Sequence, residues 1–241
     1  MKRISLFASA ILVASSLSFF TSCNNAPKSQ EAEVADTVAT VDTKEVVVAQ
    51  KNLTVLPDQS AVTWIGSKPG GQHNGTIGIA EGSNLMVDGG NLVGGVITLD
   101  MTDITVLDIE NAEDNAKLVG HLKNQDFFAV ETYPTSVFTI ASVEPVDAAT
   151  LDIPEGEHST ENPTHKITGN LKMMDTEKAI TFYANVTMPS EGEVKASAKF
   201  NIDRTEFNVS HMAEGTAKVK DKFINNTVNV GFDITAKASD M

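Results

Sequence analysis

One short stretch of the chain combines the side chains that acid–base chemistry uses. Residues 121–134, HLKNQDFFAVETYP, carry a histidine, two carboxylates and a tyrosine around a pair of phenylalanines. A catalytic loop would need a nucleophile, a base and a group that orients the base. The chain has no Gly-x-Ser-x-Gly motif, and its single cysteine, Cys23, is accounted for by an N-terminal signal. We therefore predict that His121 packs against or caps a helix, and that the chain has no catalytic residue.

Arg204 is a second residue that could contact a charged ligand. It continues the row Phe200, Ile202, Arg204 on the apolar face of an alternating segment. A buried guanidinium must meet a carboxylate or another anion, because burying an unpaired charge is prohibitively costly. Two interpretations stay open: a structural ion pair that joins strand to helix, and an anchor for the head group of an anionic ligand. The acidic residues that could form the ion pair are Asp100, Asp103, Asp126 and Glu206.

The spacing of the histidines does not indicate a metal site. None of the five forms a His-x-His or His-x-x-x-His pair, the spacings typical of zinc ligands. His158 and His165 lie with three glutamates in the segment 152–165, DIPEGEHSTENPTH, which could gather a cation. We interpret this segment as a solvated acidic loop, and we predict no metal.

The N-terminus predicts export. The chain opens with Met-Lys-Arg, continues with a short apolar stretch and reaches Cys23, a pattern that resembles a bacterial lipoprotein signal. In such signals the cysteine becomes the lipidated first residue of the mature protein. We therefore expect residues 1–22 to be removed and Cys23 to carry the acyl chains that anchor the protein to a membrane. The mature protein would lie in the cell envelope, facing the periplasm.

The charge of the mature chain limits its partners. Removal of residues 1–22 takes Lys2 and Arg3 from the 18 basic residues and leaves all 32 acidic ones, so the net charge becomes −16. Such a surface repels phosphate backbones, which argues against a nucleic-acid partner.

Residues 23–50 lack aromatic side chains and predict a flexible tether, although Val46–Val48 could begin a strand. Residues 51–241 then suit one domain.

Apolar and polar residues alternate with period two along most of this domain. Such alternation predicts antiparallel strands with one dry face and one wet face. The segment 88–91, Asp-Gly-Gly-Asn, predicts a hairpin turn, and 111–125 predicts the one helix. The predicted strands are residues 60–66, 76–80, 84–87, 92–101, 136–143, 165–174, 179–188, 193–203 and 227–236.

Eight or nine antiparallel strands with one helix predict an all-β fold, either a closed barrel or a sandwich. The inward rows mix large residues with small ones such as Gly169 and Ala184. Small inward residues either let the strands coil tightly or leave room for a ligand, so a filled core and a ligand cavity both stay open. Trp64 is either core or cavity wall. Phe127 and Phe128, which follow the helix, either plug one end of the barrel or touch a ligand.

Several of these segments together resemble one family. The stretches SAVTWIGSKPGGQHNGTIGIAEG, ITLDMTDITV, HLKNQDFFAVETYPTSVFTI, ITGNLKMMDTEKAITF and AKFNIDRTEFNV are similar in order and spacing to the YceI-like family across residues 60–236. The most specific pieces are HLKNQDFF, with its following Tyr-Pro, and NIDRTEF. One departure lies at residues 174–178, Met-Asp-Thr-Glu-Lys, where the family usually carries a Gly-x-Thr-Lys-like turn.

The resemblance implies an extended, lipocalin-like antiparallel β-barrel of about eight strands with one short helix at one end. Such a barrel would hold an elongated lipid, of polyisoprenoid or fatty acyl type, without catalysis and without another cofactor. The alternative is a structural or interaction lipoprotein with a filled barrel. No oligomeric state is indicated, and a dimer is compatible with the sequence. The residues expected to line the lipid cavity are Trp64, Phe127, Phe128, Phe138, Phe182, Phe200, Phe232 and Arg204.

Overall fold

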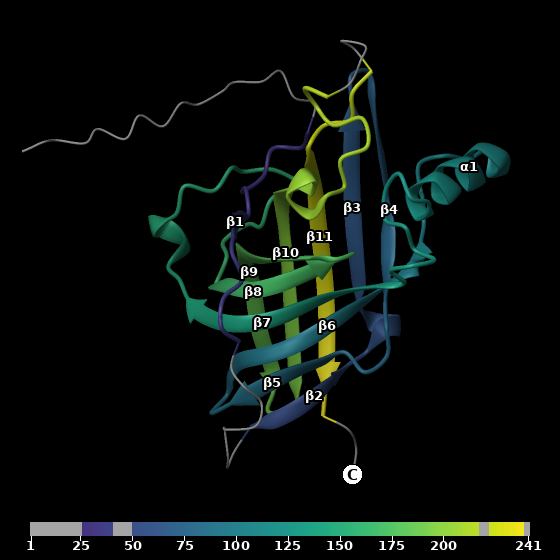
Figure 1. Cartoon of the computed structure of the whole chain (residues 1–241). Helices are drawn as coiled ribbons and strands as arrows, with labels where there is room; N and C mark the ends of the chain where they lie inside the picture. The colour runs from purple at the N-terminus through teal and green to yellow at the C-terminus, as the bar shows by residue number, and fades with distance from the viewer. Residues whose placement is uncertain (1–25, 41–49, 217–221, 239–241) are drawn as a thin grey trace, which may run out of the picture.

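A computed structural model describes residues 26–40, 50–216 and 222–238. Within these ranges the chain forms eleven strands and one α-helix, α1 (Ala112–Lys123) (Figure 1). The strands are β1 (Glu33–Ala35), β2 (Lys51–Val55), β3 (Ala61–Lys68), β4 (Gly71–Ile79), β5 (Asn84–Asp88), β6 (Asn91–Ile104), β7 (Thr135–Pro145), β8 (His165–Met173), β9 (Thr176–Ser190), β10 (Glu193–Asp203) and β11 (Thr227–Lys237).

Eight of these strands close into an antiparallel barrel, which confirms the predicted fold class. The order around the barrel is β3-β4-β6-β7-β8-β9-β10-β11, and β11 pairs again with β3. The strands β5 and β2 extend the wall at one end, because β5 pairs with β6 and β2 pairs with both β5 and β11. The predicted hairpin joins β5 to β6 through Gly89 and Gly90, whose positive φ angles of 53° and 80° suit a turn that matches the twist of the strands.

The alternating rows point inward as the periodicity predicts. On β10, Val194, Ala196, Ala198 and Phe200 are buried while Lys195 and Lys199 are exposed. The corresponding rows of the other strands meet in one large core cluster. Three aromatic pairs concentrate in this cluster: Phe182 stacks on Phe200 at a centroid distance of 4.4 Å and meets Phe138 and Phe232 at 5.7 Å. This part of the barrel is therefore solid.

The helix α1 begins where the sequence predicts it. The side chain of Asn111 accepts a hydrogen bond from the Asp114 N–H at 3.0 Å and caps the first turn, and Lys123 lies in the last turn. No helix residue is fully buried, and Figure 1 shows α1 projecting from the side of the barrel near β4. The helix therefore contributes a rim rather than a part of the core.

The segment expected to be a flexible tether packs into the barrel wall over part of its length. The pairing of β9 with β10 ends at Asn185 and Ser197, beyond which the two strands separate. Residues 29–35 fill the resulting seam: β1 pairs with β9, and Glu31 forms a bridge to Asn201 of β10. Gln30 is 6% exposed and hydrogen-bonds to both strands. The prediction of a solvated tether is therefore wrong for these residues.

The acidic loop of residues 152–165 also differs from the prediction, because its centre is buried. Ser159 and Thr160 are 5% and 6% exposed. The Thr160 hydroxyl accepts from the Lys199 N–H at 2.8 Å and donates to the Lys199 carbonyl at 3.0 Å, in the same seam between β9 and β10. Only the flanks of this loop are solvated, and its middle helps to close the barrel.

Three predictions lie outside the described residues. These are the export signal of residues 1–22, the lipidation of Cys23 and the strand start at Val46–Val48. In the ranges that the structure describes, no helix has the length and apolar character needed to cross a bilayer.

Candidate functional site

The end of the barrel opposite β2 and β5 holds an apolar cavity of about 620 Å³. This volume lies within the usual range of small-molecule sites, about 300–1,000 Å³. Its walls come from β3, β4, β6, β8, β10 and β11, and its rim comes from α1 and from the long connection between β10 and β11. The apolar wall includes Ile77, Leu99, Met101, Ile202, Val228 and Val230. The barrel is thus filled in one part and hollow in another, so neither sequence alternative describes all of it.

Trp64 lies on the cavity wall. The inward row of β3 places it beside Gly66, and both residues line the cavity. The indole packs over Gly75 of β4, where an added Cβ would lie 2.8 Å from the Trp64 ring and 1.9 Å from the Thr105 carbonyl oxygen. Only glycine leaves room for this approach, so the neighbouring strand determines where the indole sits.

Phe127 and Phe128 also line the cavity. The chain folds back on α1 after residue 124, where the Phe128 N–H donates to the Leu122 carbonyl at 3.2 Å and the Val130 N–H donates to the Lys123 carbonyl at 2.9 Å. This turn directs both rings toward the barrel, and Phe127 is 9% exposed. The two rings form part of the cavity wall, next to Leu118 and Leu122 of the helix.

Four other aromatic residues do not line this cavity. Phe138, Phe182, Phe200 and Phe232 form the solid aromatic cluster described above. The expectation that they line the lipid cavity is therefore not met. Periodicity places all inward residues on one face, but it does not say at which level of the barrel the core stops and the cavity starts.

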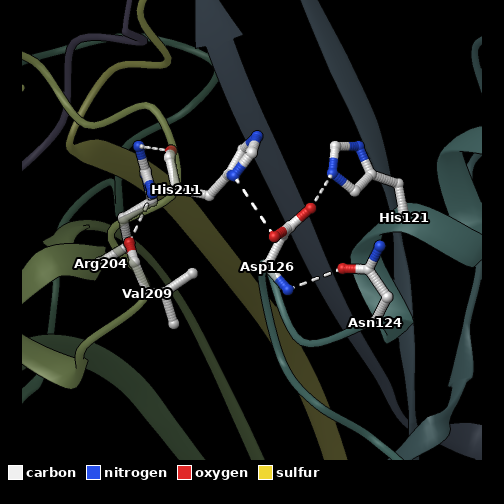
Figure 2. Close-up of polar contacts among 6 residues, drawn as sticks. All are labelled: His121, Asn124, Asp126, Arg204, Val209 and His211. Atoms are coloured by element: carbon white, nitrogen blue, oxygen red, sulfur yellow. Dashed lines mark hydrogen bonds and ion pairs between the residues drawn. The ribbon is translucent and has the colours of Figure 1, made fainter. Parts of the chain in front are cut away.

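Arg204 lines the cavity but pairs with none of the four carboxylates that the sequence offers as partners. It is 7% exposed, and its guanidinium donates to the carbonyls of Asn225 at 3.0 Å, Ile224 at 2.9 Å, His211 at 3.1 Å and Val209. Burial lowers the pKa of Arg204, and the charge of Asp203 partly opposes this effect. No ion pair between Arg204 and a carboxylate is present among the described residues, and the head-group anchor stays a prediction. Arg204 instead holds the β10–β11 connection through its bonds to the carbonyls of Val209 and His211 (Figure 2).

The β10–β11 connection is the part of the site that sequence reasoning missed. Phe207, Val209, Met212, Phe223 and Ile224 of this connection line the cavity. The sequence did contain a signal for this part of the site. The connection is rich in apolar residues although it shows no periodicity, and a connection that lies only in solvent would be mostly polar.

Two histidines and an aspartate meet at the cavity rim. Nε2 of His121 lies 3.0 Å from Oδ2 of Asp126, and Nδ1 of His211 lies 3.8 Å from Oδ1 of the same carboxylate (Figure 2). On another part of the rim, Nδ1 of His73 lies 2.8 Å from Oδ2 of Asp108. Burial alone would raise the pKa of Asp108, but hydrogen bonds from the Asn74 N–H and from His73 outweigh it, so this pKa lies below its ordinary value.

The ionisable residues of the cavity lining are all basic. They are Lys68, His73, His121, Arg204, His211 and Lys222. No carboxylate lines the described cavity, although the whole chain has 32 acidic residues and a net charge of −14. The cavity thus combines apolar walls with basic side chains at its rim, where the carboxylates of Asp108 and Asp126 are paired with histidines.

These features define a closed eight-stranded antiparallel barrel with an apolar cavity under a rim of one helix and one long connection. Residues 53–236 match the model of the YceI-like domain. The chain belongs to the YceI-like family, as the sequence resemblance indicates.

Solved structures show the same fold at low sequence identity. BcnA of Burkholderia cenocepacia matches with a TM-score of 0.55 at 18% identity, over 76% of this chain and 99% of that chain. A polyisoprenoid binding domain from Saccharophagus degradans, implicated in plant cell wall breakdown, matches with a TM-score of 0.52 at 13% identity, over 77% of this chain and 98% of that chain. A comparison with curated proteins found no match.

Proposed function

We propose that this protein binds an elongated apolar lipid, of polyisoprenoid or fatty acyl type, in the bacterial cell envelope. The observation that carries the proposal is the cavity of about 620 Å³ with apolar walls inside a YceI-like barrel. Transfer of a lipid tail from water into such a cavity gains about 0.8 kcal/mol for each buried methylene. The Saccharophagus degradans domain of the same fold, which binds polyisoprenoid, supports this ligand class.

The rim favours a ligand with a neutral or anionic head. Lys68 and Lys222 are exposed residues of the lining, so their ammonium groups can reach a head group without leaving water. No carboxylate belongs to the described lining, and Asp108 and Asp126 at the rim are paired with histidines, so local repulsion of an anionic head is reduced. The tail would occupy the barrel and the head would remain at the rim.

The proposed function is binding and not catalysis. Lipid sequestration or transport needs only a cavity that takes up and releases its ligand, and no bond is made or broken. The family to which the chain belongs is one of binding proteins, which supports this assignment.

The proposed acyl anchor on Cys23 would attach close to the cavity. The Pro27 carbonyl accepts a hydrogen bond from the Asn201 side chain at 2.9 Å, three residues before Arg204 of the cavity lining. Four residue steps separate Cys23 from Pro27, a span of at most about 14 Å. A lipidated Cys23 would therefore hold the barrel near the membrane, from which a lipid could enter the cavity.

The decisive experiment identifies the ligand directly. The mature chain with Cys23→Ser, which cannot be acylated, is purified from the envelope of its expression host and denatured, and the released small molecules are analysed by mass spectrometry. A stoichiometric isoprenoid or fatty acyl lipid is the expected result. If the protein is released empty and then takes up neither isoprenoid nor fatty acid, the proposal is wrong.

A cavity-filling variant locates the binding site. Leu99 of β6 lines the cavity, whereas Thr102 of the same strand is exposed. Leu99→Trp should reduce lipid binding at least about tenfold by occupying the tail site, which corresponds to about 1.4 kcal/mol. Thr102→Trp is the matched control and should bind normally. Equal binding by both variants would place the lipid elsewhere.

Fractionation tests the anchor separately. The full-length chain should sediment with membranes, whereas residues 23–241 with Cys23→Ser, exported behind a conventional cleavable signal, should stay in the soluble fraction while the lipid cavity remains functional. A Cys23→Ser protein that still sediments with membranes would contradict the anchor and leave the cavity proposal untouched.

A further inference from the structure

Three side chains that commonly bind metals converge at the rim of the cavity. The ligand atoms of His121, Asp126 and His211 all lie within 4.8 Å of one another. They come from three separate places in the fold: α1, the turn that follows it, and the β10–β11 connection. Figure 2 shows both imidazoles directed toward the carboxylate of Asp126 from opposite sides.

Neighbouring groups hold each of these three residues in place. The Asp126 N–H donates to the side-chain oxygen of Asn124 at 2.8 Å, which orients the turn that carries the carboxylate. Arg204 donates to the His211 carbonyl at 3.1 Å, so the buried guanidinium positions this histidine. The ring of Phe127 packs at centroid distances of 5.0 Å from His121 and 5.1 Å from His211. The cluster is thus supported from the core side as well as from the loops.

We propose that His121, Asp126 and His211 form a binding site for a divalent transition-metal ion of the Zn²⁺ type. Zn²⁺ lies about 2.0–2.2 Å from imidazole nitrogens and carboxylate oxygens, so two tetrahedral ligands are about 3.3 Å apart. The His121 nitrogen lies 3.0 Å from Oδ2 of Asp126 and the His211 nitrogen lies 3.8 Å from Oδ1, so each imidazole is close to this distance from one oxygen of the carboxylate. Two imidazoles and a carboxylate are a ligand set that zinc and neighbouring metals favour over Mg²⁺ or Ca²⁺.

The setting of the cluster suits such an ion. The side chains of His121, Asp126 and His211 are 41%, 53% and 25% exposed, so an ion can reach them from solvent. The net charge of −14 attracts cations to the protein surface. Three protein ligands leave a fourth position for water or for an oxygen atom of another molecule. A bound ion would also join α1 to the β10–β11 connection across the cavity rim.

Calorimetric titration with ZnCl2 tests the site without any lipid. The mature chain with Cys23→Ser is stripped with a chelator and titrated at neutral pH, alongside the single variants His121→Ala, Asp126→Asn and His211→Ala. We expect one Zn²⁺ per chain, and each variant should lose at least about 100-fold in affinity, because replacing even an outer-sphere partner costs 10–100-fold. His73→Ala is the matched control, since His73 also pairs with an aspartate on the rim but lacks a third ligand.

Each outcome decides the proposal. Stoichiometric binding that depends on all three residues and survives His73→Ala supports it, as does an increase in melting temperature with Zn²⁺ that the three variants lose. Absence of stoichiometric binding, or binding that His73→Ala reduces as much as His211→Ala does, would overturn it. Circular dichroism of each variant separates lost affinity from lost folding, and Asp126→Asn, which preserves the shape of the side chain, serves where an alanine variant unfolds.

Discussion

The side chain of Gln30 hydrogen-bonds to both backbone groups of Tyr183. Its oxygen accepts from the Tyr183 N–H at 2.8 Å, and its nitrogen donates to the Tyr183 carbonyl at 2.9 Å. A neighbouring strand would normally satisfy these two groups, but β10 has already separated from β9 at this level. The amide side chain of Gln30 thus makes the two hydrogen bonds that a neighbouring strand would make, and the N-terminal segment becomes part of the barrel wall.

Gln30→Ala should destabilise the protein by about 2 kcal/mol, because it leaves two backbone groups without their partner. The change in the free energy of unfolding is measured by urea denaturation of the mature chain with Cys23→Ser. Gln59→Ala is the control, since Gln59 is exposed and its loss should cost less than about 0.5 kcal/mol. Equal effects of the two substitutions would show that the seam contributes nothing to stability.

Met174→Gly should stabilise the barrel by about 0.5–1 kcal/mol. Met174 lies in the turn between β8 and β9 with a φ angle of 53°, a left-handed conformation that costs a residue with a side chain about 1–2 kcal/mol. Glycine adopts it freely but loses more entropy on folding, so the net gain is smaller than the relieved strain. Asp175→Gly, at the adjacent turn residue with no positive φ, should bring no gain. Thermal and urea unfolding of both variants provide the comparison.

Much of the barrel could be predicted from the sequence because each of its strands is half buried. The alternating residues of β10 indicate which face of the strand is buried. The pair Gly89-Gly90 indicates a hairpin because glycine readily adopts the positive φ angles that the turn requires. The packing of residues 29–35 into the seam between β9 and β10 could not be predicted in this way. Its contacts combine a strand of only three residues, β1, with the side chain of Gln30, and three residues are too few for a period to be visible.

The residues that line the cavity were harder to predict, because periodicity does not give the height of a residue along the barrel. Trp64 and Phe200 both lie on inward rows, yet one lines the cavity and the other fills the core. The difference depends on the height of each residue along the barrel, which depends on the register of several strands. Arg204 was expected to meet either a carboxylate or an anionic ligand, but its partners within the chain are backbone carbonyls up to 21 residues away in a connection without periodicity. His211, in the same connection, approaches Asp126 only through tertiary folding.

Stability should depend on pH through His165. Partial burial lowers the pKa of this imidazole in the folded state, so the unfolded chain binds the proton more readily. The free energy of unfolding should therefore fall as the pH decreases through the unfolded pKa of about 6.5 and should be fully retained above it. His165→Gln should lose this dependence. The test compares urea unfolding of both proteins between pH 5 and 8; curves that stay parallel over the whole range would show that His165 does not contribute.

Arg204→Met should destabilise the protein by about 4 kcal/mol or more, since it leaves several buried carbonyls without the donors that Arg204 supplies. Arg204→Lys should recover little, because one ammonium group cannot reach carbonyls spread around a planar guanidinium. Lys199→Met is the control: Lys199 is exposed and its ammonium meets one carbonyl, that of Glu157, so we expect a loss below about 1 kcal/mol. Urea denaturation measures stability, and lipid uptake is measured on the folded fraction. If Arg204→Met instead folds with normal stability and has lost lipid affinity, Arg204 contacts the ligand head and its role in holding the β10–β11 connection is wrong.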